Sequence, residues 1–178
     1  MTASLAALGL ELVPAHEVPA DDLLRFELAE RAWFRRSIPD RGDDYYTREA
    51  VEASLASART WWEAGTDRLH VLRDEAGEVV ARANLVDIEA GTASLGYRVA
   101  ERRTGRGVAT AAVAVLLERA PGYGVDRVCA TTSTDNVASQ RVLRRLGFVE
   151  LDTPVAPLEF DGRTLPAVRF ERRVGDEV

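Results

Sequence analysis

A turn that combines arginine and glycine is the part of the sequence with the clearest chemical potential. It reads Arg-Arg-Thr-Gly-Arg-Gly over residues 102–107 and runs into small and apolar residues that favour a helix. Gly105 and Gly107 let the backbone bend so that successive N–H groups point at one spot, where the positive end of the helix dipole also lies. We therefore expect the turn to bind an anion, with a phosphate group as the expected ligand.

A second candidate segment lies further along the chain, at residues 136–148. Asn136 opens a predicted helix, Ser139 falls in its first turn, and the run Leu-Gly-Phe at 146–148 ends it. In the simplest interpretation Asn136 only caps the helix and the apolar residues belong to the core. We favour contact with a ligand for Asn136, because the anion-binding turn expected at residues 102–107 lies upstream in the chain.

Together with the strand predicted at residues 92–99, these segments resemble the GNAT superfamily of acetyl-CoA-dependent N-acetyltransferases. Arg102, Gly105 and Gly107 match the family's phosphate motif Arg/Gln-x-x-Gly-x-Gly/Ala, and residues 136–148 match its Asn-x-x-Ser/Ala…Leu-Gly-Phe segment. Overall the chain resembles the RimJ/RimL-like branch, the ribosomal-protein-alanine acetyltransferase type. The resemblance implies acetyl-CoA (coenzyme A) as the cofactor.

The resemblance also implies which residues bind that cofactor. Main-chain N–H groups of the glycine turn would hold the CoA pyrophosphate, a strand would pair with the pantetheine arm, and an asparagine side chain would contact it. The residues concerned are Tyr97, Arg98, Val99, Arg102, Arg103, Thr104, Gly105, Arg106, Gly107, Val108, Ala109, Asn136 and Ser139. The side chains of Arg98 and Arg106 could add positive charge there or could simply be exposed to solvent.

The catalytic acid common in the family is missing from its usual place. Seven residues after the asparagine, where many GNAT enzymes have a tyrosine, this chain has Leu143, which cannot donate a proton. The RimJ/RimL resemblance implies Ser139 as the group that protonates or stabilises the CoA thiolate. It also implies Glu159 as the base that removes a proton from the amine. Alternative bases are Glu101, Asp87, Glu89 and Asp161.

Composition excludes several other chemistries. All 23 basic residues are arginine, so a lysine Schiff base and a Walker A loop are both excluded. One cysteine cannot form an internal disulfide, and two widely separated histidines do not have zinc-ligand spacing, so we expect no metal. The net charge of −6 argues against nucleic-acid binding. The lack of a membrane-spanning run or a signal peptide predicts a cytoplasmic protein that does not bind membranes.

The expected elements alternate along the chain as one α+β domain over residues 1–178. Hydrophobic patterns predict strands at residues 8–13, 68–72, 79–88, 92–99, 125–132, 148–151 and 165–172. Helices are predicted from Ala20 up to Pro39, from Thr47 to Gly65, from the glycine turn to Pro121, and at residues 136–146. The GNAT fold that this order resembles has a mostly antiparallel mixed sheet of about seven strands with about four helices. Its parallel pair of strands splays apart to form the cofactor cleft.

The acceptor side is expected from the first two helices and their connection, residues 34–46, which are dense in aromatic and charged side chains. Asp43 and Asp44 could bind an ammonium group or could simply be solvated. Trp33, Trp61 and Trp62 could form pocket walls, although the helical spacing of Trp62 favours core packing. Cys129 lies in the middle of a predicted strand and is expected to be buried, which disfavours an acetyl-cysteine route.

These observations predict an N-acetyltransferase in which a primary amine attacks the thioester directly. The acceptor is either a protein N-terminal α-amine or a small-molecule amine, and a homodimer is one option for the assembly. A catalytically weak acyl-CoA sensor is the alternative, because Leu143 replaces the usual tyrosine. Another kind of nucleotide-binding protein would need a fully parallel sheet, with an acid on the strand at residues 127–131 that the sequence does not provide.

Overall fold

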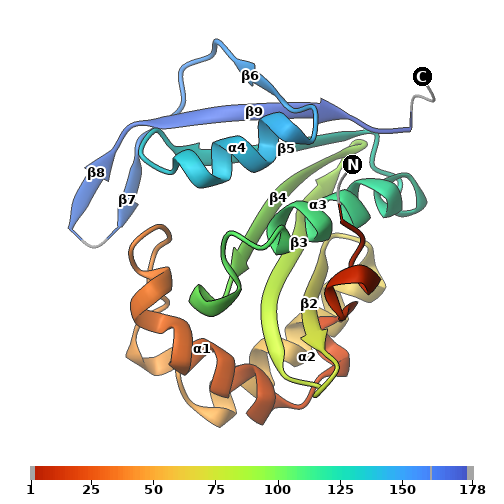
Figure 1. The fold of residues 1–178 in the computed structure, drawn as a ribbon, viewed down its shortest axis with the longest axis vertical. Helices are drawn as coiled ribbons and strands as arrows, with labels where there is room; N and C mark the ends of the chain where they lie inside the picture. Colours follow the sequence, from red (N-terminus) through yellow and green to blue (C-terminus); the bar gives the residue numbers. More distant parts are fainter. Residues whose placement is uncertain (1–2, 161, 176–178) are drawn as a thin grey trace.

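The computed structural model describes residues 3–160 and 162–175, and its main feature is a mixed seven-stranded sheet with helices on both faces (Figure 1). The strand order is β1-β2-β3-β4-β5-β9-β6, and every neighbouring pair is antiparallel except β4 and β5. In that order the strands are Leu10–Pro14, Arg68–Asp74, Val79–Glu89, Thr92–Val99, Arg127–Ser133, Ala167–Arg173 and Val149–Leu151. This sheet confirms the predicted fold class.

The parallel contact between β4 and β5 is short. It covers three residue pairs, Thr92 with Arg127, Ala93 with Val128, and Ser94 with Cys129. Beyond these pairs β4 stays bonded to β3 as far as Val99, and β5 stays bonded to β9 as far as Ser133. Because each strand follows its outer neighbour, the two diverge and leave a wedge between them, as predicted.

Four α-helices cover the sheet: α1 (Ala20–Phe34), α2 (Arg48–Ala64), α3 (Val108–Arg119) and α4 (Val137–Arg145). The α3 and α4 helices share one hydrophobic core with the sheet, and α1 and α2 share a second core on its other side. In α2 the buried residues Val51, Leu55 and Ala58 recur at helical spacing. Thr47 caps the start of α2 by accepting a hydrogen bond from the Ala50 N–H, and Gly65 ends the helix with φ of 81°.

Short 3₁₀ helices connect several of these elements, at Ala6–Leu8, Ala15–Glu17, Asp43–Tyr45, Glu101–Arg103 and Ala120–Tyr123. Within residues 3–160 and 162–175, no helix has the length and apolar character needed to cross a bilayer.

The sequence prediction differs from the structure at one helix end and in one hairpin. The first helix ends at Phe34 rather than near Pro39, because the N–H groups of Ser37 and Ile38 both turn back to the Phe34 carbonyl. An additional hairpin, β7 (Leu158–Phe160) with β8 (Arg163–Leu165), forms between the strands predicted at residues 148–151 and 165–172. Pro166 separates β8 from β9, since proline cannot donate a ladder hydrogen bond.

Candidate active site

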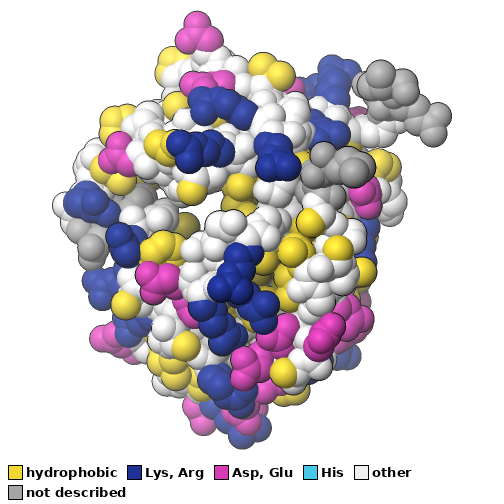
Figure 2. Space-filling view, viewed as in Figure 1, with side chains coloured by type: hydrophobic (Ala, Val, Ile, Leu, Met, Phe, Trp, Pro, Cys, Tyr) yellow, Lys and Arg dark blue, Asp and Glu magenta, His cyan; other side chains and the backbone are white. Residues whose placement is uncertain are grey.

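A cleft of about 590 Å³ lies in the wedge between β4 and β5. Its walls come from the open end of β4, the glycine turn, the start of α3, the end of β5, α4 and the segment that follows α1. Figure 2 shows the hollow between the part of the molecule that carries α4 and the part that carries α1 and α2. The topology therefore brings both candidate segments of the sequence to one cavity.

The glycine turn forms the anion-binding corner of this cleft. Gly105 and Gly107 have φ values of 70° and 82°, a left-handed conformation that other residues adopt only at a cost. No heavy atom lies within 4 Å of where a Cβ would stand on either glycine. Gly107 caps α3, whose first N–H groups have no partners within the helix. The open backbone and the helix dipole fit a diphosphate group.

The arginines of this turn point in different directions. Arg103 lines the cleft and pairs with Asp74, with 2.6 Å between Nη2 and Oδ2. Arg102 pairs with Glu78 at 3.1 Å, and more than half of both side chains is exposed. The described lining does not include Arg102 or Arg106, whereas it does include Thr104, Val108 and Ala109. For Arg106, where both added charge and plain solvent exposure were left open, the geometry gives no support to added charge. Arg102, predicted from its match to the phosphate motif, also stands outside the lining.

Two arginines that were not predicted line the cleft from α4. They are Arg141 and Arg145, which lie four residues apart and so share one face of the helix. The spacing of these arginines in the sequence could have revealed them, but a basic helix face is more often simply solvated.

The start of α4 is fixed by hydrogen bonds that the sequence indicated only in part. The Ser139 N–H donates to Oδ1 of Asn136 at 3.1 Å, so Asn136 is a helix cap and also lines the cleft. Gln140 is buried and donates through Nε2 to the carbonyls of Ser133 and Thr134, at 3.2 and 2.8 Å. These bonds hold the first turn of α4 against the end of β5.

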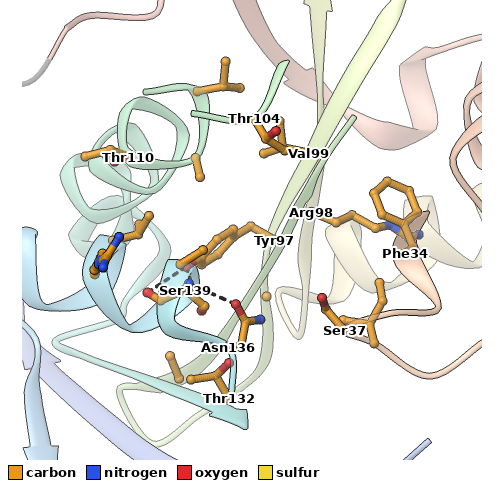
Figure 3. Close-up of a pocket in the computed structure, with 18 of the residues that line it drawn as sticks. Phe34, Ser37, Tyr97, Arg98, Val99, Thr104, Thr110, Thr132, Asn136 and Ser139 are labelled. Atoms are coloured by element: carbon orange, nitrogen blue, oxygen red, sulfur yellow. Dashed lines mark hydrogen bonds between the residues drawn. The ribbon is translucent and has the colours of Figure 1, made fainter. Parts of the chain in front are cut away.

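Ser139 contacts a tyrosine from the opposite wall of the cleft. Its Oγ lies 2.9 Å from the phenol oxygen of Tyr97, which also lies 3.3 Å from the Ser139 carbonyl (Figure 3). Burial raises the pKa of Tyr97, and the hydrogen bond with Ser139 opposes that rise only in part. Leu143 is fully buried and packs in the core. The sequence therefore identified Ser139 but gave no indication of its tyrosine partner.

The structure does not bring Glu159 to Ser139. Leu158 lines the cleft, and Glu159, the next residue along β7, is exposed and accepts a hydrogen bond from Thr164 Oγ1 at 2.8 Å. Side chains alternate along a strand, which explains why the two residues face opposite ways. Glu101, Asp87 and Glu89 are also absent from the lining, and Asp161 lies outside the described residues. Among the described residues that line the cleft, none is Asp, Glu or His.

The end of the cleft where the acceptor was expected is lined by the end of α1 and the loop after it. Trp33, Phe34, Ser37 and Ile38 line it, and Trp33 donates from Nε1 to the Val99 carbonyl at 3.2 Å. The predicted role of Trp33 as a wall is thus confirmed. Trp61 is instead exposed on α2, and Trp62 contacts His16, His70 and Tyr123 away from the cleft.

The two aspartates that could bind an ammonium group, Asp43 and Asp44, have different surroundings in the structure. Arg31 binds Asp40 through two bonds of 3.0 and 2.5 Å and reaches Asp43 at 2.7 Å. Tyr46 also donates to Asp40, and Arg31 holds the pKa of Asp40 well below its usual range. Asp43 is therefore part of an ion-pair network that shapes the loop, while Asp44 is exposed.

Arg98 points away from Ser139, toward Phe34 and α1 (Figure 3). Its Nη2 lies 2.5 Å from Oε1 of Glu27, which also accepts from Arg82 at 2.7 Å. The Glu27 side chain is fully buried, and those of Arg82 and Arg98 are 3% and 12% exposed. Two guanidinium groups and one carboxylate give this buried cluster a net charge of +1. The predicted use of this side chain for the cofactor is thus not supported, although Arg98 still lines the cleft.

The geometry also bears on an acetyl-cysteine route and on a metal site. Cys129 is buried in β5 with 4% exposure, as predicted, and does not line the cleft. Among the described residues no group of His, Cys, Asp and Glu side chains could hold a metal ion.

Comparisons with known proteins agree with this geometry. Residues 10–149 match the family described as acetyltransferase (GNAT) domain. The ribosomal-protein-S5-alanine acetyltransferase from Vibrio fischeri superposes with a TM-score of 0.85 at 18% identity, over 94% of this chain and 93% of that chain. RimJ from Mycobacterium smegmatis, in complex with CoA-disulfide, gives 0.81 at 25% identity, over 92% and 81%.

A third solved structure is RimL, the ribosomal L7/L12 alpha-N-protein acetyltransferase, in complex with coenzyme A. It gives a TM-score of 0.83 at 21% identity, over 93% of this chain and 94% of that chain. No curated protein sequence matches the chain.

Proposed function

Since the chain belongs to the acetyltransferase (GNAT) domain family, we propose that its cleft transfers the acetyl group of acetyl-CoA to an α-amine. Acetyl-CoA supplies the acetyl group as a thioester. The backbone from Arg103 to Ala109 would hold the diphosphate, helped by Arg141 and Arg145 at the cleft wall. The open edge of β4 from Tyr97 to Val99 would pair with the pantetheine arm, and Asn136 would contact it from the start of α4.

The choice of an α-amine depends on the absence of Asp, Glu and His from the described cleft lining. An amine must be neutral to attack a carbonyl, and without a base in the cleft it must lose its proton to water before it reacts. At pH 7.4 about a quarter of an α-amine with a pKa near 7.9 is neutral, against about 0.1% of a lysine amine with a pKa near 10.4. This difference of roughly 200-fold in the neutral fraction favours α-amines.

The buried charge behind Phe34 supports the same choice. Glu27, Arg82 and Arg98 together carry a net positive charge, which disfavours an ammonium group at the acceptor end and favours its neutral form. A polyamine brings several positive charges and is therefore a poor match. RimL, among the structural neighbours, acts on an α-amine of a ribosomal protein, which is the acceptor class proposed here.

Ser139 is the proposed proton donor for the leaving thiolate. It lies in the first turn of α4, where the helix dipole stabilises negative charge, and it lines the cleft. The exposed position of Glu159 gives no support for its role as base. We treat residues 1–178 as one acetyltransferase domain that acts in the cytoplasm, and light scattering would distinguish a monomer from a homodimer.

Turnover of acetyl-CoA against peptides with free α-amines, capped lysine peptides and polyamines tests the proposal. We expect α-amine peptides to give the highest kcat/KM at pH 7.4, and Ser139→Ala to slow thiol release without a change in CoA affinity. A preference for polyamines would contradict the acceptor class. Tight CoA binding with no turnover on any amine would instead support the acyl-CoA sensor.

A further inference from the structure

We propose that Tyr97 is a positioning residue that aims the Ser139 hydroxyl at the sulfur of the thioester, and so replaces the donor that Leu143 cannot supply. The inference rests on the proposed function, because it assigns a role within the same cleft. Tyr97 lies on β4 and Ser139 lies on α4, and both line the cavity, so their contact joins two of its walls.

The contact is specific in its atoms. The Tyr97 phenol oxygen lies 2.9 Å from Ser139 Oγ and 3.3 Å from the Ser139 carbonyl, and both are hydrogen-bond distances. Asn136 holds the N–H of the same serine at 3.1 Å. Ser139 is therefore fixed on its backbone side by Asn136 and approached at its hydroxyl by Tyr97, as Figure 3 shows.

The direction of this hydrogen bond determines what Ser139 can do. A hydroxyl has one proton and two lone pairs, so a serine oxygen that accepts from the phenol keeps its own proton for a third group. Burial raises the pKa of Tyr97, so the phenol stays protonated at neutral pH and remains a donor. The phenol has a single proton, which the Ser139 carbonyl at 3.3 Å and Ser139 Oγ at 2.9 Å can share. In the arrangement that we infer, it points mainly at the nearer Oγ, and the Ser139 proton then points into the cleft toward the leaving sulfur.

The proton transfers balance without an additional reactant. As the amine nitrogen bonds to the acetyl carbon, the carbon–sulfur bond breaks and its electron pair goes to sulfur. The Ser139 proton passes to sulfur and forms the thiol, while Tyr97 keeps its own proton and stabilises Ser139 Oγ through the hydrogen bond. The amine nitrogen releases one proton to water, and Ser139 regains one from water.

A double-mutant cycle tests this role with an α-amine peptide as acceptor. A positioned general acid contributes about 10²–10⁴ in rate, so we expect Tyr97→Phe to lower kcat about tenfold or more and to leave the KM for acetyl-CoA unchanged. In a Ser139→Ala background the same change should alter kcat less than about twofold, because the two groups act as one unit. Equal effects in both backgrounds, or an unchanged kcat in Tyr97→Phe, would overturn the inference.

Tyr123→Phe is the matched control. Its phenol lies 3.5 Å from His70 Nε2, and the described cleft lining does not include it. We expect its kcat to equal that of the unmodified enzyme, and a tenfold loss would overturn the inference by showing that kcat follows any partly buried phenol.

A second measurement needs no turnover. In the ligand-free protein labelled with [13Cζ]tyrosine, Ser139→Ala should shift the NMR resonance of Tyr97 and leave the Tyr123 resonance in place. An unmoved Tyr97 resonance would remove the contact and the inference with it. If no amine is acetylated at all, the proposed function fails; if the enzyme is active but the cycle is additive, only the role of Tyr97 fails.

Discussion

Replacement of Glu27 by glutamine removes the carboxylate that faces two guanidinium groups in the interior. Glu27 is fully buried, and Arg82 is only 3% exposed. The Arg82 guanidinium therefore cannot recover its hydration when the carboxylate is removed. Removal of one partner from a buried ion pair costs about 3–5 kcal/mol, since the remaining charge stays unpaired. Arg98, at 12% exposure beside the cleft, can draw in water, which places the expected loss near the lower end of that range.

The assay is thermal and urea unfolding of Glu27→Gln next to a matched control. For a chain of this length, a loss of 3–5 kcal/mol lowers the melting temperature by roughly 6–20 °C. The control is Glu52→Gln, which breaks the exposed pair with Arg48 on α2 and should change the stability far less, because water screens this pair. If Glu27→Gln is as stable as Glu52→Gln, the cluster does not hold a buried unbalanced charge and the argument from it about the acceptor is wrong.

Three further predictions follow from single sites. Burial lowers the pKa of His70 to about 4, so between pH 6.5 and 4 this histidine takes up a proton in the unfolded chain but not in the native protein. The free energy of unfolding should therefore fall by about 3 kcal/mol as the pH drops through this window. His70→Gln should abolish that fall. Gly107→Ala should let the turn relax out of its left-handed conformation in the free protein. The roughly 1–2 kcal/mol needed to restore that conformation should weaken CoA binding about tenfold in calorimetry. Gly122→Ala, outside that region of φ, should bind normally. Glu159→Gln should keep its kcat, and a tenfold loss would restore Glu159 as the base.

Local sequence patterns predicted most of the fold. Thr47 and Gly65 act at the ends of α2 as expected, because a cap and a left-handed turn depend on the residue itself and its nearest neighbours. The glycine turn before α3 could be predicted for the same reason, because it depends only on residues next to one another in the sequence. By contrast the hairpin β7–β8 depends on pairing across a turn, and its three-residue strands are too short to show periodicity.

The candidate site was predictable only where the residues belong to contiguous motifs. Asn136 and Ser139 could be identified because both lie in one helix start. The contact between Tyr97 and Ser139 joins residues from two walls of the cleft, and no spacing in the sequence indicates it. The role of Arg98 was missed for a similar reason, since its partner Glu27 lies on another element and is hidden in the core.

The most direct test of the account is the position of the acetyl group on a peptide that carries both a free α-amine and an internal lysine. The enzyme itself contains no lysine, so acetyl-lysine in the reaction mixture can come only from the peptide. Tandem mass spectrometry after reaction with acetyl-CoA at pH 7.4 should find the enzyme-dependent acetyl group on the α-amine. Enzyme-dependent acetylation of the lysine alone, or a peptide left as unmodified as in the enzyme-free sample, would contradict the account.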